Sequence, residues 1–208
     1  MPIGPSIRQM FGPFESQVSE FYRSIFVNLT AFVEQINSWT SASNILEIGC
    51  GEGAVAERLV KTYPYAIYTG IDITPRVGRM FKGTSTHVAF KQQSIKEIAL
   101  EISTPFDLIV ICDIMHHIPW ELHTDILTDA KKTLKPGGYL VLKDWERSAT
   151  PIHFLCHFAD RYITGDTVKY KSADELQELI ESVFGTDSIK AKNSIQPWSN
   201  NIAFLVQG

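Results

Sequence analysis

Three glycines at alternating positions follow a short apolar segment and offer a binding surface made of main chain. Residues 45–53 read Ile-Leu-Glu-Ile-Gly-Cys-Gly-Glu-Gly, and a helical stretch at 54–61 comes directly after them. Glycine adopts backbone conformations closed to other residues, and its missing side chain lets a ligand approach the main chain. The N–H groups that begin the following helix add hydrogen-bond donors. The pattern predicts a ligand-binding turn at Gly49, Gly51 and Gly53.

A carboxylate follows at the spacing expected of a ribose-binding group. Asp72 ends a second apolar segment, Tyr68-Thr-Gly-Ile-Asp72, nineteen residues after Gly53. An acidic residue at the end of the strand after a glycine turn can accept hydrogen bonds from a pair of ribose hydroxyls. The two features together predict a cofactor that contains ribose.

These segments resemble the motifs of the class I S-adenosylmethionine-dependent methyltransferases, and the resemblance extends over residues 44–208. Residues 47–53 look like the first motif of that family, and Asp72 looks like its ribose-binding acid. The segment 106–117 resembles the strand and loop beneath the methyl donor, and 134–142 resembles the turn and strand that follow. The resemblance implies S-adenosylmethionine as cofactor and a small molecule as methyl acceptor. It also implies an α/β, Rossmann-like fold with a seven-stranded, mostly parallel sheet, helices on both faces and a C-terminal antiparallel hairpin.

The resemblance further implies which residues bind the cofactor. Aligning 88–95 on the family's fourth segment puts Ser94 where many members carry an acidic residue, and the backbone of Ile95 could serve there instead. Glu47 suits a cofactor with a sulfonium and an ammonium group. The expected cofactor-binding residues are Glu47, Gly49, Cys50, Gly51, Gly53, Asp72, Ile73, Ser94, Ile95, Cys112 and Asp113.

Two other interpretations stay open from the sequence. Gly49-x-Gly51-x-x-Ala54 also satisfies the dinucleotide pattern, with Asp72 as its ribose acid, so an NAD(P)-dependent oxidoreductase is one alternative. Glu47 would be awkward beside a pyrophosphate, and the later motifs have no place in that alternative. The second is a binding protein that keeps the cofactor fold without turnover, since fold is not function.

Two histidines after the fourth predicted strand are candidates for a catalytic base. Methyl transfer from a sulfonium needs alignment and exclusion of water, and it needs a base only when the acceptor arrives protonated. A neutral imidazole of His116 or His117 suits that role near pH 7. The alternative is that they hold the loop by hydrogen bonds.

Asp113 and Asp144 close the fourth and fifth predicted strands, so both could face the active site. They could bind a divalent ion, orient a cationic acceptor, or remain solvated acids. Only two ligands are visible, so we expect no metal.

The segment 145–171 follows the fifth predicted strand and mixes aromatic and polar residues. Ligands of open α/β sheets lie beyond the carboxyl ends of the strands, so this insertion is placed to cap the acceptor. The alternative is a satellite helix whose apolar positions, Ile152, Leu155, Phe158 and Tyr162, fill the core. The expected acceptor-binding residues are Asp144, His153, His157, Arg161 and Tyr162.

The remaining pattern predicts one domain with a helical cover. Apolar residues recur at helical spacing over 14–39, with room for one break, so we expect residues 1–43 to form a cover or lid. Strands and helices alternate from Asn44, which predicts a core over 44–208 with a parallel sheet.

Local signals set several expected boundaries. Thr74-Pro75 predicts the start of a helix, and Pro119 opens another that runs to about Leu134. The capping box Ser172-x-x-Glu175 starts a helix that Gly185 ends. Strands around 188–195 and 202–207 should pair antiparallel.

Composition narrows the partners and the compartment. The chain has 208 residues, 44% of them hydrophobic, enough for one buried core. A net charge of −4 without a run of Lys or Arg argues against nucleic acid. No apolar stretch predicts a membrane span or a signal peptide. Cys50, Cys112 and Cys156 are too scattered for a disulfide framework or a zinc site, which favours the cytoplasm. Oligomeric state is not readable from the sequence.

Overall fold

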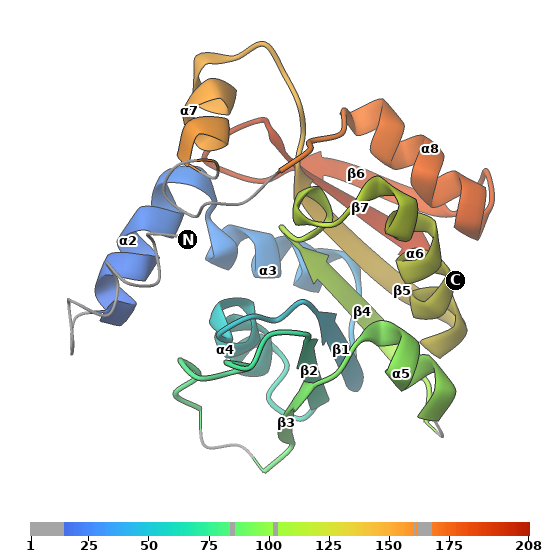
Figure 1. Ribbon diagram of the computed structural model, residues 1–208. Helices are drawn as coiled ribbons and strands as arrows, with labels where there is room; N and C mark the ends of the chain where they lie inside the picture. Colours follow the sequence, from blue (N-terminus) through green and yellow to red (C-terminus); the bar gives the residue numbers. More distant parts are fainter. Residues whose placement is uncertain (1–14, 84–85, 102–103, 160, 162–167) are drawn as a thin grey trace.

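A seven-stranded sheet with the order β3-β2-β1-β4-β5-β7-β6 forms the centre of the computed structural model (Figure 1). The structure describes residues 15–83, 86–101, 104–159, 161 and 168–208. The strands are β1 (Asn44–Ile48), β2 (Ile67–Asp72), β3 (Val88–Gln92), β4 (Phe106–Cys112), β5 (Leu134–Trp145), β6 (Ile189–Ser194) and β7 (Asn201–Gln207). Strands β1 to β5 are parallel, and β7 pairs antiparallel with both β5 and β6. The predicted sheet and its terminal hairpin are confirmed.

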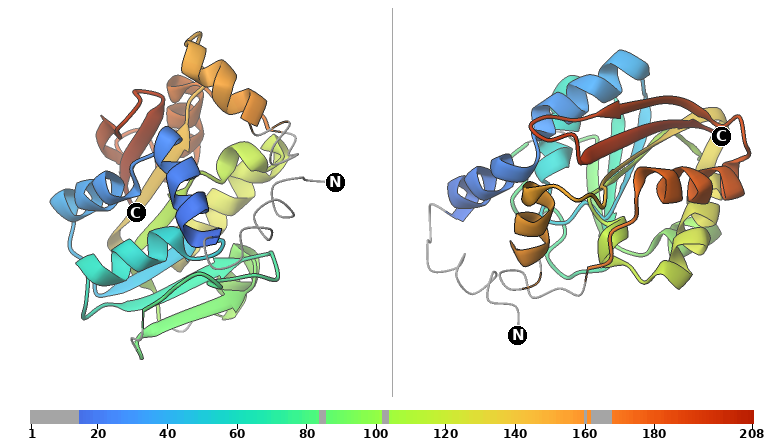
Figure 2. Two further views of the ribbon diagram at one scale, coloured as in Figure 1. Left: turned by 90° about the vertical axis from the view of Figure 1, so that its left-hand side faces the viewer. Right: turned by 90° about the horizontal axis from the view of Figure 1, so that it is seen from above.

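Helices cover both faces of this sheet (Figures 1 and 2). On one face α3 (Leu29–Trp39) and α4 (Ala54–Thr62) share a core cluster with Leu108 and Val110 of β4. On the other face α5 (Ile95–Glu101), α6 (His123–Thr133) and α8 (Ala173–Phe184) pack with Ile109 and Ile111. Successive residues of a strand point to opposite faces, so an unbroken apolar run supplies both cores.

The predicted N-terminal helix is two helices, α2 (Glu15–Phe26) and α3. The side chain of Asn28 accepts a hydrogen bond from the N–H of Ala31 at 3.0 Å and caps α3. This cap explains the single break that the spacing allowed. The end of α2 reaches the carboxyl end of β5, where the rings of Phe26 and Trp145 lie edge to face with centroids 6.1 Å apart.

The prediction that a helix starts at Thr74-Pro75 is wrong. Residues 73–80 form bends and turns that fold back on the glycine turn. The N–H of Thr74 donates to the Asp72 carboxylate at 2.8 Å, and the N–H of Gly78 donates to the carbonyl of Gly51 at 2.9 Å. A side-chain partner at Asp72 and main-chain partners in the glycine turn thus replace the hydrogen bonds of a local helix.

The helix expected from Pro119 to Leu134 is shorter than predicted. A 3₁₀ turn, η3 (Trp120–Leu122), precedes α6, and Leu134 already belongs to β5. The capping box at Ser172 is confirmed, because its side chain accepts from the N–H of Glu175 and the Glu175 carboxylate accepts from the N–H of Ser172. Gly185 ends that helix as predicted.

Among the described helices, none combines the length and apolar character needed to span a membrane. The three cysteines are buried and none forms a disulfide, as expected.

Candidate active site

The glycine turn connects β1 to α4 at the carboxyl edge of the sheet. Gly49, Gly51 and Gly53 have φ angles of 72°, 50° and 97°, in the left-handed region that favours glycine. A Cβ atom added to Gly49 would lie 2.7 Å from the Ile114 side chain. A Cβ atom added to Gly51 would meet no described atom within 4 Å. Packing therefore requires Gly49, whereas Gly51 borders open space in which a ligand can approach the main chain.

Asp72 and the glycine turn are in direct contact. One carboxylate oxygen of Asp72 accepts the N–H of Gly51 at 2.8 Å, and the other accepts the N–H of Thr74. The next residue, Ile73, has an apolar side chain that is 76% exposed. The structure thus places the expected ribose acid and an exposed apolar side chain beside the turn. Their contact with a cofactor stays a prediction.

Glu47 lies beneath the turn with its carboxylate buried. It accepts a hydrogen bond from the hydroxyl of Tyr68 across the β1–β2 pair. Burial raises the pKa of Glu47 to about 8, although the Tyr68 hydrogen bond opposes that shift. Gly70, the register partner of Glu47, leaves room for this contact, since a Cβ there would lie 2.9 Å from the Tyr68 hydroxyl. Sequence analysis did not single out Tyr68 as a partner of Glu47. Its only signal in the sequence was an aromatic residue two positions before a glycine in the same predicted strand.

The other expected cofactor residues have occupied or buried side chains. Cys50 and Cys112 are buried, and burial raises the pKa of both thiols, so they stay neutral. The N–H and hydroxyl of Ser94 both donate to the Glu97 carboxylate at 2.7 Å, which caps α5. Ile95 begins α5 with its side chain in the core. An adenine contact through the Ser94 side chain would have to compete with this cap.

His116 and Asp144 form a buried pair at the ends of β4 and β5. Nδ1 of the His116 ring lies in hydrogen-bond contact with Oδ1 of Asp144, and the backbone N–H of His116 donates to Oδ2 at 3.1 Å. The N–H of Trp145 also donates to Oδ1, at 2.8 Å. Asp144 is 2% exposed, so its interpretation as a solvated acid is wrong.

The carboxylate fixes the state of the imidazole. Burial raises the pKa of Asp144, but the charge and hydrogen bond of His116 and the N–H of Trp145 outweigh it and hold that pKa below its ordinary value. An ionised carboxylate only accepts hydrogen bonds, so Nδ1 of His116 carries a proton. In the neutral ring the lone pair is then on Nε2, the arrangement required of a base.

Asp113 pairs with a lysine that sequence analysis passed over. Lys143 is fully buried, and its Nζ lies 2.6 and 2.7 Å from the two carboxylate oxygens of Asp113. Ligand atoms of Asp113, His116 and Asp144 lie within 4.8 Å of one another, close enough for one metal ion. Both carboxylates already have partners, because Lys143 forms an ion pair with Asp113 and His116 is hydrogen-bonded to Asp144. That the protein works without a metal stays a prediction.

Tyr170 joins the strand-end residues to the helix α7 (Pro151–Ala159). Its ring stacks on His116, with centroids 4.9 Å apart, and lies 5.0 Å from His153 and 6.1 Å from His157. The indole N–H of Trp145 donates to Nδ1 of His153 at 3.1 Å. The structure therefore brings the expected base and two expected acceptor residues around Tyr170, which no spacing rule had singled out.

The buried face of α7 is not the one that an apolar core helix would use. His153 and Cys156 are buried, whereas Leu155 and Phe158 are 51% and 55% exposed. Ile152 is half-buried. The alternative in which Leu155 and Phe158 fill the core is therefore wrong, and the face that turns inward carries His153, Cys156 and Ala159.

The remaining expected catalytic and acceptor-binding residues are His117, Arg161 and Tyr162. His117 is exposed, with its ring centroid 4.2 Å from that of His116. Arg161 is exposed, and Tyr162 lies outside the described residues.

A third histidine holds the loop after β4. Nε2 of His123 lies 2.8 Å from the carbonyl oxygen of Met115 and 3.0 Å from that of Ile118, so it donates to both. Burial lowers the pKa of His123, which keeps the ring neutral. His123 thus adds a structural histidine at the start of α6, beside the hydrogen bonds by which His116 itself holds the loop to Asp144.

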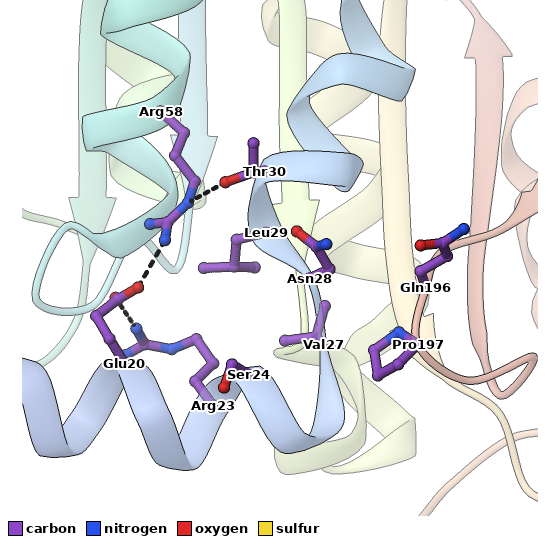
Figure 3. Close-up of a pocket in the computed structure, with 10 residues that line it drawn as sticks. All are labelled: Glu20, Arg23, Ser24, Val27, Asn28, Leu29, Thr30, Arg58, Gln196 and Pro197. Carbon is purple, nitrogen blue, oxygen red and sulfur yellow. Dashed lines mark hydrogen bonds and ion pairs between the residues drawn. The ribbon is translucent and has the colours of Figure 1, made fainter.

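The N-terminal helix α2 is tied to the helix after the glycine turn. Glu20 of α2 pairs with Arg58 of α4 at 2.6 Å and with Arg23 of its own helix (Figure 3). These side chains border a pocket of about 310 Å³ between α2, α3, α4 and the β6–β7 connection. Its lining also includes Ser24, Val27, Asn28, Leu29, Thr30, Gln196 and Pro197. The contact connects the expected cover to the expected cofactor helix.

The family described as "Methyltransferase domain" matches residues 45–138, which contain the glycine turn, Asp72 and the His116 loop. Residues 45–138 are thus a methyltransferase domain, as the resemblance to the class I S-adenosylmethionine-dependent methyltransferases implied. The predictions of the family and of S-adenosylmethionine as its methyl donor are thereby confirmed. The match also decides against the dinucleotide alternative.

Similar proteins and structures agree with this assignment. The chain is 29% identical over 148 residues to "Ubiquinone biosynthesis O-methyltransferase" of Xanthomonas oryzae pv. oryzae (strain PXO99A), which covers 67% of this chain and 59% of that protein. The chain thus spans about three fifths of the length of the curated relatives that it matches. The structure of the pyocyanin biosynthetic protein PhzM has a TM-score of 0.72 at 13% identity, over 98% of this chain and 61% of PhzM. The N-methyltransferase NodS from Bradyrhizobium japonicum WM9, solved with S-adenosyl-L-homocysteine, has a TM-score of 0.60 at 21% identity, over 94% of this chain and 88% of NodS. Similarity at this level supports the fold.

Proposed function

We propose that this methyltransferase transfers a methyl group to a hydroxyl oxygen of a small aromatic acceptor, with His116 as the base. The observation that carries the proposal is the buried pair of His116 and Asp144. Support for an oxygen acceptor comes from the relative named above, an O-methyltransferase. Support for an aromatic acceptor comes from the Tyr170 ring, which stacks on the base, and from the His153 ring, which lies against Tyr170.

In this proposal, different residues bind the methyl donor and activate the methyl acceptor. Gly51 and Asp72 offer the open main chain and the carboxylate that fit a ribose-containing cofactor. When bound, S-adenosylmethionine would supply a methyl group on a sulfonium, a carbon already activated for in-line attack by an oxygen nucleophile. Nε2 of His116 accepts the hydroxyl proton, and Asp144 stabilises the resulting imidazolium. The second carboxylate, Asp113, is balanced by Lys143.

The chain around the site supplies a cover and a cap in this proposal. In the cover expected over residues 1–43, the described helices are α2 and α3, and the contacts of α2 with Trp145 and Arg58 support it; residues 1–14 lie outside the described part. In the cap expected over residues 145–171, the inward face of α7 supports the role; residues 160 and 162–167 lie outside the described part. The buried, reduced cysteines favour work in the cytoplasm. We expect no nucleic-acid partner, because the net charge of −4 attracts no polyanion.

The test measures S-adenosylhomocysteine formation with a panel of simple phenols and catechols. We expect turnover with at least one acceptor, and a loss of about 10²-fold or more in kcat for His116→Asn at unchanged cofactor affinity. His117→Asn, at the exposed neighbour, is the matched control and should keep most of the turnover. Donor hydrolysis without methyl transfer would favour the non-catalytic alternative, and full activity of His116→Asn would show that His116 is not the base.

A further inference from the structure

Two consecutive residues of β5 hold two residues of the loop that follows β4. Lys143 and Asp144 point to opposite sides of the sheet, as neighbours in a strand must. Asp144 binds His116, and Lys143 binds Asp113 with both its backbone carbonyl and its ammonium group. The backbone N–H of Asp113 donates to the Lys143 carbonyl at 2.9 Å.

Asp113 has a backbone conformation that needs such support. Its φ angle is 54°, and no other described residue apart from glycines has a positive φ. This left-handed region is disfavoured for residues with a side chain, although aspartate tolerates it better than most. The turn at Asp113 directs the chain out of β4 toward η2 (Met115–His117), which carries His116.

Within the described residues, the side-chain hydrogen bonds of the Lys143 ammonium group go to one carboxylate. Its side chain is 1% exposed, and both of its hydrogen bonds go to the Asp113 carboxylate, which is itself 29% exposed. The Cys112 thiol makes a weaker contact with the same carboxylate, at 3.6 Å. A buried ammonium costs free energy unless it is paired, so an apolar residue would serve the core better. The pairing of this buried ammonium with Asp113 therefore points to a role at the site.

We propose that Lys143 is a positioning residue that holds Asp113 in its left-handed turn and thereby keeps His116 against Asp144. The inference rests on the proposed function for its effect on turnover. The geometric part stands separately, because the His116–Asp144 contact can be observed without an acceptor.

The test uses Lys143→Met, which keeps an unbranched apolar stem and removes the ammonium. We expect the downfield Nδ1 proton resonance of His116 to shift or broaden, and kcat to fall about ten- to hundred-fold. The cofactor dissociation constant should change less than about threefold, since Gly51 and Asp72 are untouched.

Two double variants separate conformation from charge. Lys143→Met with Asp113→Gly removes the unpaired carboxylate and makes a positive φ easy, so it should recover the His116 resonance. Lys143→Met with Asp113→Ala removes the same charge but still disfavours the turn, so it should not recover that resonance. Equal recovery by both would overturn the positioning role in favour of a charge effect.

The outcomes also distinguish this inference from the proposed function. If Lys143→Met leaves both the His116 resonance and kcat unchanged in the folded protein, the inference is wrong whatever the base. If the resonance moves but His116→Asn keeps full turnover, Lys143 positions the loop and His116 is not the base. The glycine double variant provides the folded comparison should Lys143→Met be unstable.

Discussion

The hydroxyl of Tyr68 donates a hydrogen bond to the carboxylate of Glu47 across the β1–β2 pair. Burial raises the pKa of Glu47 from 4.5 to about 8, the Tyr68 hydrogen bond lowers it, and the Asp72 charge raises it further. Between these two values the folded protein holds a proton on Glu47 that the unfolded chain has lost. Folding and proton binding are therefore linked at this residue.

The first prediction concerns stability without cofactor. The contribution of Glu47 is fully present below about pH 4.5 and is lost as pH rises through about 8, because the folded state keeps its proton up to the raised pKa. From pH 6 to 8 this residue should lower the free energy of unfolding by on the order of 2 kcal/mol. In Glu47→Gln, the free energy of unfolding measured with urea should not show this part of the decrease between pH 6 and 8. Glu57→Gln, at an exposed position of α4, should retain it, and identical pH profiles for both variants would refute the assignment.

The second prediction concerns proton release on cofactor binding. The ammonium and sulfonium charges of S-adenosylmethionine favour the ionised carboxylate, so binding near pH 7 should expel the Glu47 proton. Calorimetric titrations of the cofactor in phosphate and in Tris should then give different binding enthalpies. The difference should equal the number of protons released times the difference between the ionisation enthalpies of the two buffers. Glu47→Gln should show no such difference. Equal wild-type enthalpies in both buffers would mean that the cofactor charges do not reach Glu47.

The third prediction concerns Gly51. A side chain there would enter open space without touching the core, so Gly51→Ala should weaken cofactor binding about tenfold or more and leave the protein folded. Its φ of 50° adds backbone strain of about 1–2 kcal/mol. Gly137→Ala is the matched control, because Gly137 also has a positive φ, of 74°, and an added Cβ there likewise meets no described atom within 4 Å. Unchanged affinity in Gly51→Ala, or an equal loss in both variants, would place the cofactor elsewhere.

The cofactor side of the site was largely predictable, because it depends on residues close together in sequence. The glycine turn follows from residues 45–53, and Asp72 follows from the spacing of two strands. The prediction of a helix at Thr74 failed because the N–H groups of Gly78 and Met80 donate to carbonyls of the glycine turn. Helix start signals are local in sequence and do not include such distant partners.

The acceptor side depends on register and on distant segments. Lys143 looks like one polar residue in an apolar strand, and only the pairing of Cys112 with Lys143 shows that it reaches Asp113. Tyr170 is separated from His116 by most of two helices and a strand, so no periodic pattern relates the two rings. Tertiary packing alone assembles this half of the site.

The last prediction concerns the inward face of α7. His153 is buried, accepts the indole N–H of Trp145 at 3.1 Å and lies against Tyr170, whereas Phe154 on the same helix is 66% exposed. Burial and the charges of His157 and Arg147 lower the pKa of His153, so the ring stays neutral and can accept that hydrogen bond. His153→Ala leaves the Trp145 N–H without a partner and removes one wall next to Tyr170.

We therefore expect His153→Ala to lower kcat/KM for the acceptor by about tenfold or more, equivalent to about 1.4 kcal/mol, with cofactor affinity unchanged. Phe154→Ala is the control on the same helix and should leave both quantities near wild type. Steady-state kinetics with the acceptor found in the phenol panel, together with cofactor titrations, check this. If both variants keep wild-type kinetics, α7 does not contact the acceptor. If His153→Ala loses acceptor and cofactor binding together with a lower Tm, its histidine supports the fold and another segment chooses the acceptor.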